Sequence, residues 1–187
     1  YVKKSFFPDS TRPQVMIDFW MPQGTKIEKT AEILKNIQQQ IAKLDGVTHT
    51  TTIVGKGALR FILTYAPEKG NSAYAQMLID IDDFKNLDKT IKEVNILVKK
   101  DFPMIKSFGR KFVLGPGAGG KIQEKIFGKD ENKIREYEEK ILKIFQKNKL
   151  TKGLRTDWRD RVKVIRPVVL DQVATLNGIS SRDIANA

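Results

Sequence analysis

Hydrophobic side chains recur at every second residue from 15 to 21, and this period of two predicts a β-strand with two distinct faces. Pro22 and Gly24 end the strand. Thr25 and Glu28 then have the spacing of a capping box, in which each side chain bonds a free amide at the start of a helix. Apolar residues follow at intervals of three and four, up to a stop at Asp45-Gly46. The first 46 residues therefore predict a strand followed by an amphipathic helix.

The same two periods continue to residue 114. Residues rich in threonine and valine or alternating in polarity predict strands, and the three-to-four spacing of Leu87, Ile91, Val94 and Val98 predicts a second helix. The predicted extended stretches are 47–54, 59–65, 74–81 and 108–114. The order of strand, helix, strands, helix and strand predicts an α+β fold, a ferredoxin-like split β-α-β sandwich.

After residue 120 the pattern begins again. It predicts a strand at 122–127, a helix capped by Asp130, strands at 154–158 and 162–169, and a final helix capped by Ser180 or Ser181. This second α/β unit lacks the remaining strands of a sandwich, so the simplest description is a partial repeat of the first unit. We expect two lobes that meet at residues 115–120.

The stretch GPGAGGKI, residues 115–122, has the G-x-x-x-x-G-K spacing of a phosphate-binding loop. The motif needs a serine or threonine next, to bind magnesium, but Ile122 stands there. Pro116 removes one amide from the cradle, and Gly128 interrupts the helix that should follow. The sequence therefore favours a flexible joint over a nucleotide site.

Composition limits the function further. The 187 residues contain no cysteine and no run of eighteen apolar residues, so disulfides, thiolate metal sites and a membrane span within this stretch are excluded. The net charge of +12, from 34 basic and 22 acidic residues, could attract nucleic acid, but many lysines alternate with glutamates on predicted helix faces. His49, the single histidine, is set among threonines, which favours a position on a sheet surface over a role as a metal ligand, since metal sites need three or four donors. No paired-carboxylate site stands out. We expect neither an enzyme nor a cofactor.

Two spaced segments resemble resistance–nodulation–division (RND) efflux transporters. The first, SFFPDSTRPQVMIDFWMPQGTKIEKT, covers residues 5–30, and the likeness lies in Phe7-Pro8, Arg12-Pro13, the strand and the Gly24-Thr25 turn. The second, LRTDWRDRVKVIRPVVLDQVATLNGISSRDIANA, covers 154–187 and is similar to the passage from porter to docking domain. Together the two segments most resemble the second large periplasmic loop of the AcrB-like hydrophobe/amphiphile branch.

The resemblance implies a domain plan and a setting. Residues 1–116 would form one porter subdomain, 117–160 half of a second, and 161–187 the start of a docking segment. The glycines of the joint, Gly115, Gly117, Gly119 and Gly120, would then act as a hinge. The whole protein would be a homotrimeric, proton-driven pump of the Gram-negative inner membrane, working with a periplasmic adaptor and an outer-membrane channel. It would export amphiphilic compounds and bind no nucleic acid, and the fragment alone would have no activity.

The resemblance also marks candidate residues of the substrate path. Phe108, Arg110 and Phe112 share one face of the last strand before the joint, where family members have aromatic residues along the path. Arg60 and Phe61 lie in a stretch that corresponds loosely to a substrate-gating loop. The alternative is that the rings belong to the core, since alternation alone does not say which face the helices cover. The four methionines (Met16, Met21, Met77 and Met104) are scattered, which argues against the metal-exporting branch.

A binding module for RNA is the rival interpretation. KGALRFILTY, residues 56–65, resembles the strand signature of an RNA-recognition motif, which shares the ferredoxin-like fold. The spacing departs from that signature, because Ala58 stands where its first aromatic residue belongs. Stacking of bases would also require Phe61 and Tyr65 to be exposed on one sheet face.

Overall fold

The computed structural model describes residues 10–113, 115, 122–148, 150–151, 153–163, 168 and 170–186. Of the predicted hinge, only Gly115 is among them; Gly117, Gly119 and Gly120 lie outside the described residues. Residues 116–121 of the stretch GPGAGGKI also lie outside the described residues, as do residues 164–167 and 169 of the last predicted strand.

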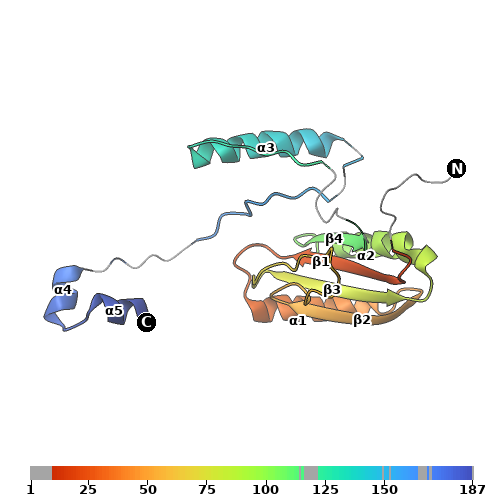
Figure 1. Cartoon of the computed structure of the whole chain (residues 1–187), viewed down its shortest axis with the longest axis horizontal. Helices are drawn as coiled ribbons and strands as arrows, with labels where there is room; N and C mark the ends of the chain where they lie inside the picture. Colours follow the sequence, from red (N-terminus) through yellow and green to blue (C-terminus); the bar gives the residue numbers. More distant parts are fainter. Residues whose placement is uncertain are drawn as a thin grey trace.

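A four-stranded antiparallel sheet forms the centre of the first unit (Figure 1). Its strands are β1 (Gln14–Trp20), β2 (Val47–Val54), β3 (Tyr74–Ile81) and β4 (Lys106–Lys111), in the order β2-β3-β1-β4. Helix α1 (Ile27–Ile41) follows β1, and helix α2 (Leu87–Asp101) follows β3 after the short 3-10 helix η1 (Phe84–Asn86). This is the ferredoxin-like arrangement, so the predicted α+β fold is confirmed.

The helices pack on one face of the sheet and enclose the main core. From β1 this face contributes Val15, Ile17 and Phe19, all with no exposed surface. The other fully buried residues of the cluster come from the helices, from β3 and from the residue before β3: Leu34, Ile37, Ile41, Ala73, Ala75, Met77, Ile79, Val94 and Val98. Burial of each large aliphatic side chain contributes about 1.5–3 kcal/mol, and this core fixes the orientation of every strand.

Two local predictions in this unit are wrong. The capping box is absent: Thr25 donates its hydroxyl to the carbonyl oxygen of Pro22 at 2.6 Å, and the first helical turn receives no side-chain cap. Residues 57–70 form no strand, although their hydrophobic residues alternate. Gly46 has a positive φ of 78°, but α1 already ends at Ile41 with Ala42 as its C-cap, before the stop predicted at Asp45-Gly46.

Among the described residues after 121, the regular secondary structure is helical. Helix α3 (Glu131–Lys147) has Asp130 as its N-cap. The Asp130 carboxylate accepts hydrogen bonds from the amides of Asn132 and Lys133, which confirms the predicted cap. The short helices α4 (Asp171–Leu176) and α5 (Ser181–Asn186) follow. Ser180 caps α5, and its hydroxyl accepts from the amide of Asp183 at 3.3 Å.

The predicted strands at 122–127 and 154–158 are absent, and no strand forms at 162–163. Helix α3 lies apart from the four-stranded sheet, with α4 and α5 farther away (Figure 1). A strand needs a neighbouring strand for its backbone hydrogen bonds, and the part of the chain that the structure describes places none beside these segments.

Candidate functional site

The face of the sheet opposite α1 and α2 carries the candidate site. The antiparallel register places Asp18 between Gln76 of β3 and Phe108 of β4, and Met16 beside Arg110. Cross-strand partners share a face, so Phe108 and Arg110 lie on the side without helices. Phe112, the residue after the end of β4, packs with Met16 on the same side. Alternation in the sequence does not say which face of the sheet the helices cover. The structure shows that they cover the face opposite these residues.

Asp18 is the centre of a buried polar network on this face. Its side chain retains 5% exposure and lies 3.1 Å from a guanidinium nitrogen of Arg110. Its other carboxylate oxygen accepts hydrogen bonds from the Tyr74 hydroxyl and the Gln76 amide, both at 2.7 Å. A charge buried this deeply must be paired and hydrogen-bonded, and here three side chains meet that need.

Gln76 joins this network to the segment 55–72, which we call the covering loop because it lies over part of this face. The Gln76 amide oxygen accepts from the backbone N–H of Ala58 at 2.9 Å and from the Tyr65 hydroxyl at 3.0 Å. Gln76 has no exposed surface. A side chain of the sheet therefore satisfies a backbone donor of the loop.

Both tyrosines of the network remain protonated well into the alkaline range. Burial is the largest influence that raises the pKa of Tyr74, and the adjacent Asp18 carboxylate raises it further. Burial likewise raises the pKa of Tyr65, against a smaller opposing effect of its hydrogen bond to Gln76. With protonated phenols and a carboxylate already bonded by three partners, the network holds the loop rather than supplying a nucleophile or a base.

Three aromatic rings meet where the covering loop crosses β4. The Phe61 ring lies 5.3 Å from Tyr65 and 5.4 Å from Phe112. Phe112 is buried at 6% exposure, whereas Phe61 is 40% exposed. We call these three rings the aromatic cluster. Leu59 and Leu63 stand out from the same loop at more than four-fifths exposure, so the cluster borders an apolar surface.

Arg60, also predicted for the substrate path, does not join this cluster. Its side chain is exposed and donates to the Leu63 carbonyl within the same loop at 2.5 Å. The structure therefore brings Phe61, Arg110 and Phe112 together around Tyr65, with the Arg110 guanidinium 5.7 Å from the Tyr65 ring centroid, and leaves Arg60 outside.

A second segment, residues 153–163, lies over the other end of the same face. Arg155 stands 5.6 Å from the centroid of the Phe108 ring, and a Cβ atom at Gly153 would overlap that ring. Arg159 stacks 4.1 Å from the Trp20 ring centroid and binds Glu68 of the covering loop at 2.8 Å. Phe108 is thus half-buried beneath this segment.

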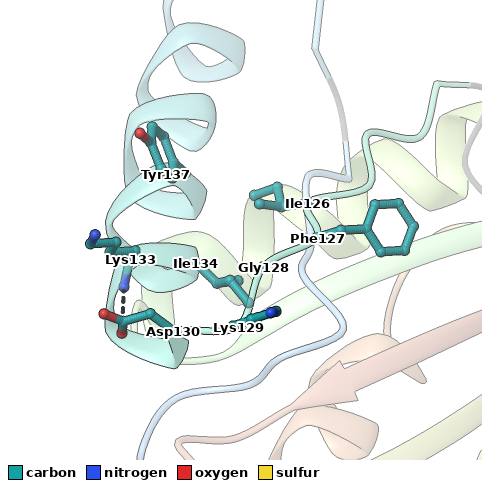
Figure 2. A pocket seen from close by; sticks show the side chains of 8 residues that line it. All are labelled: Ile126, Phe127, Gly128, Lys129, Asp130, Lys133, Ile134 and Tyr137. Carbon is teal, nitrogen blue, oxygen red and sulfur yellow. Dashed lines mark hydrogen bonds between the residues drawn. The ribbon is translucent and has the colours of Figure 1, made fainter.

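The hollow at the start of α3 is a separate feature (Figure 2). Ile126, Ile134 and Tyr137 contribute apolar side chains to its lining, and Phe127 points away from the helix. The carboxylate of Asp130 is occupied as the helix cap. This hollow brings no reactive groups together and contributes nothing to the candidate site.

The sequence interpretation missed Asp18, Gln76, Trp20 and Arg159. A single aspartate in an alternating strand suggests a solvent-facing position, and only the covering loop buries it. Tyr65, one of the rings that the RNA-recognition interpretation requires on a sheet face, is 4% exposed and lies outside any strand. The exposed rings that the RNA-recognition interpretation requires are therefore not formed.

Metal-binding groups are dispersed in this structure. Among the described residues, no three His, Cys, Asp or Glu side chains gather closely enough to hold an ion. Met21 and Met77 lie in the helix-side core, Met16 is on the opposite face, and Met104 is 74% exposed. His49 is exposed on β2, as expected. Within the same described residues no helix is long and apolar enough to cross a membrane.

Comparison with known proteins relates the chain to a protein family and to solved structures. The family described as AcrB/AcrD/AcrF matches residues 1–187. A heavy metal efflux pump, in its crystal form I, aligns with a TM-score of 0.69 at 11% identity, over 97% of this chain and 20% of that chain. Its crystal form II aligns at 0.45 and 14% identity, over 56% of this chain and 11% of that chain.

The chain therefore spans about a fifth of the pump's length, and at this identity the likeness shows the fold alone. No curated protein matches.

Proposed function

The chain belongs to the AcrB/AcrD/AcrF family of RND transporters, which are not enzymes, and from this membership we propose that it is a periplasmic porter segment of a proton-driven efflux pump. The segment would come from the second large periplasmic loop of a pump in a Gram-negative inner membrane. It would line the path along which substrates leave.

Amphiphilic compounds are the proposed substrates. The observation that carries this proposal is the half-exposed Phe61 ring, seated between Tyr65 and Phe112. Aromatic faces offer a large contact area with loose geometry, which suits ligands of varied shape. The polar groups beneath them, above all Asp18, are already bonded within the protein. The dispersed methionine thioethers favour the hydrophobe/amphiphile branch over one that exports soft metal ions.

The proposed domain plan also has support in the second part of the chain. Residues 1–116 would form a complete porter subdomain, 117–160 half of another, and 161–187 the start of a docking segment. Tyr137 and Ile144 of α3 are 54% and 67% exposed. An amphipathic helix with exposed apolar residues needs a partner surface, which the rest of a half-built subdomain would provide. The joint at Gly115 would be the hinge between the two subdomains.

The assembly is proposed from the family alone. It comprises a homotrimer of the full pump, a periplasmic adaptor and an outer-membrane channel. The segment itself requires no cofactor, because the proton gradient would drive transport through transmembrane residues outside this chain.

An export assay tests the proposal. In the full-length pump, expressed in an efflux-deficient host, Phe61→Ala and Phe108→Ala should change which amphiphilic dyes and detergents are exported, at unchanged pump abundance. Ile96→Ala is the matched control, because Ile96 is 66% exposed on α2, which packs on the opposite face. Resistance to zinc and copper salts is measured in parallel. A wild-type pump that confers metal resistance but exports no amphiphile would contradict the substrate proposal.

A further inference from the structure

Arg159 contacts three separate parts of the molecule. Its guanidinium lies 4.1 Å from the Trp20 ring centroid on β1 and 2.8 Å from the carboxylate of Glu68 in the covering loop. Its backbone carbonyl accepts a hydrogen bond from Arg135 of α3 at 2.8 Å. One residue therefore links the sheet, the covering loop and the helix of the second unit.

Movement of Glu68 would also move the aromatic cluster. Its carbonyl accepts from the Gly57 amide at 3.0 Å, which holds the two arms of the covering loop together. At Gly57 a Cβ atom would lie 2.6 Å from the Glu68 amide nitrogen and 2.7 Å from the Tyr65 hydroxyl. The arms are in close contact there, so movement of Glu68 must also move Tyr65, on which the Phe61 ring packs.

The link from Arg159 to α3 is equally direct. Arg135 donates to the carbonyls of Trp158 and Arg159 at 2.6 and 2.8 Å, and its guanidinium lies 5.2 Å from the Trp158 ring centroid. A nearby ion pair with Glu138 at 3.1 Å fixes the position of Arg135. Displacement of α3 would therefore pull on the backbone that carries the Arg159 side chain.

We propose that Arg159 is a positioning residue that couples α3 to the covering loop and so sets how far the Phe61 ring is presented to substrate. Only arginine combines the planar face that stacks on an indole with a fork of donors for a carboxylate. Lysine would retain the attraction to Glu68 and lose the stacked geometry. The consequence for substrate range rests on the proposed function; the coupling itself does not.

Amide hydrogen exchange of the full-length pump tests the coupling. Loss of one partly exposed ion pair and one cation–π contact should accelerate exchange in peptides from 55–72 by about fivefold in Arg159→Ala. Glu68→Gln should give a smaller acceleration, and the double variant should exchange no faster than Arg159→Ala. Arg159→Lys should fall between wild type and Arg159→Ala. The exchange rate of peptides from α1 should be unchanged, which would show that the variants retain the fold.

Arg161→Ala is the matched control, because Arg161 binds Asn132 of α3 at 2.8 Å, a contact that does not involve the covering loop. Unchanged exchange at 55–72 in Arg159→Ala, or fully independent effects of the Arg159 and Glu68 changes, would overturn the coupling.

Export by the same variants tests the consequence for substrates. Arg159→Ala should alter the ratio of exported dyes while Arg161→Ala does not. Faster loop exchange with an unaltered ratio would overturn the role in specificity. A wild-type pump that exports no amphiphile would instead refute the proposed function and leave the exchange result standing.

Discussion

The guanidinium of Arg110 lies 3.1 Å from the carboxylate of Asp18, on the sheet face that α1 and α2 leave uncovered. The pair connects the outer strand β4 to the inner strand β1 beneath the covering loop. Asp18, a polar residue of the sheet, thereby supports the covering loop, which presents apolar side chains.

Removal of Arg110 alone should be costly. Arg110→Ala leaves the buried Asp18 carboxylate without its counter-charge, and we expect a loss of about 3 kcal/mol in the free energy of unfolding. Arg110→Ala with Asp18→Asn removes the charge but keeps an oxygen that accepts from Tyr74, so it should unfold at higher urea than Arg110→Ala. A double variant less stable than the single one would show that charge burial is not the cause.

Alkaline pH should destabilise the chain through its buried phenols. Because burial raises the pKa of Tyr74 and Tyr65 above the ordinary 10.0, the unfolded phenols release protons first as pH rises. The contribution of the protonated phenols to the free energy of unfolding is complete below pH 10. Above pH 10 it declines by about 1.4 kcal/mol per pH unit for each phenol. Tyr74→Phe should reduce this slope in urea unfolding between pH 9 and 11.5. An identical slope in both proteins would contradict the assignment.

Gly109 permits α2 to approach β4 closely. A Cβ atom there would lie 2.7 Å from Ile91 Cγ2 and 2.8 Å from Ile17 Cδ1. Gly109→Ala should therefore lower the free energy of unfolding by about 1–3 kcal/mol. The matched control is Gly70→Ala, because nothing lies within 4 Å of that position. Equal stability of the two variants would mean that the helix moves away without cost.

The two phenylalanines of the aromatic cluster should respond differently to truncation. Phe112 is 6% exposed and packs with Met16, Ala58 and Tyr65, so Phe112→Ala should cost about 3 kcal/mol. Phe61 is 40% exposed, and Phe61→Ala should cost less than about 1 kcal/mol. Chemical unfolding measures both. Similar losses would show that Phe61 is a core residue rather than a surface available to ligands.

Much of the fold follows from local pattern. The strand at 74–81 has the predicted bounds, α1 and α2 occupy the predicted periodic stretches, and Asp130 caps α3 as expected. These elements are encoded in spacings of two, three and four residues along the chain, together with end signals that act over a single turn. No distant contact is needed to recognise them.

Local pattern fails where a partner outside the pattern decides the structure. Residues 59–65 alternate like a strand, yet the amide of Ala58 just before them bonds a side chain, Gln76, and the amide of Tyr65 bonds the Ile62 carbonyl within the loop. Thr25 has the spacing of a cap, yet its hydroxyl bonds the Pro22 carbonyl in the preceding turn. In both cases the competing partner lies outside the pattern that made the prediction.

Alternation in the sequence is enough to predict that Phe108, Arg110 and Phe112 share a face, because side chains alternate along any strand. Which face they occupy follows from the packing of the folded chain. Helices α1 and α2 pack against Val15, Ile17 and Phe19 and bury one side of the sheet, and the three predicted residues lie on the other. The same packing leaves Asp18 to be covered by a loop and paired with Arg110. Burial and charge pairing depend on segments that are distant in the chain, so residue spacing does not predict them.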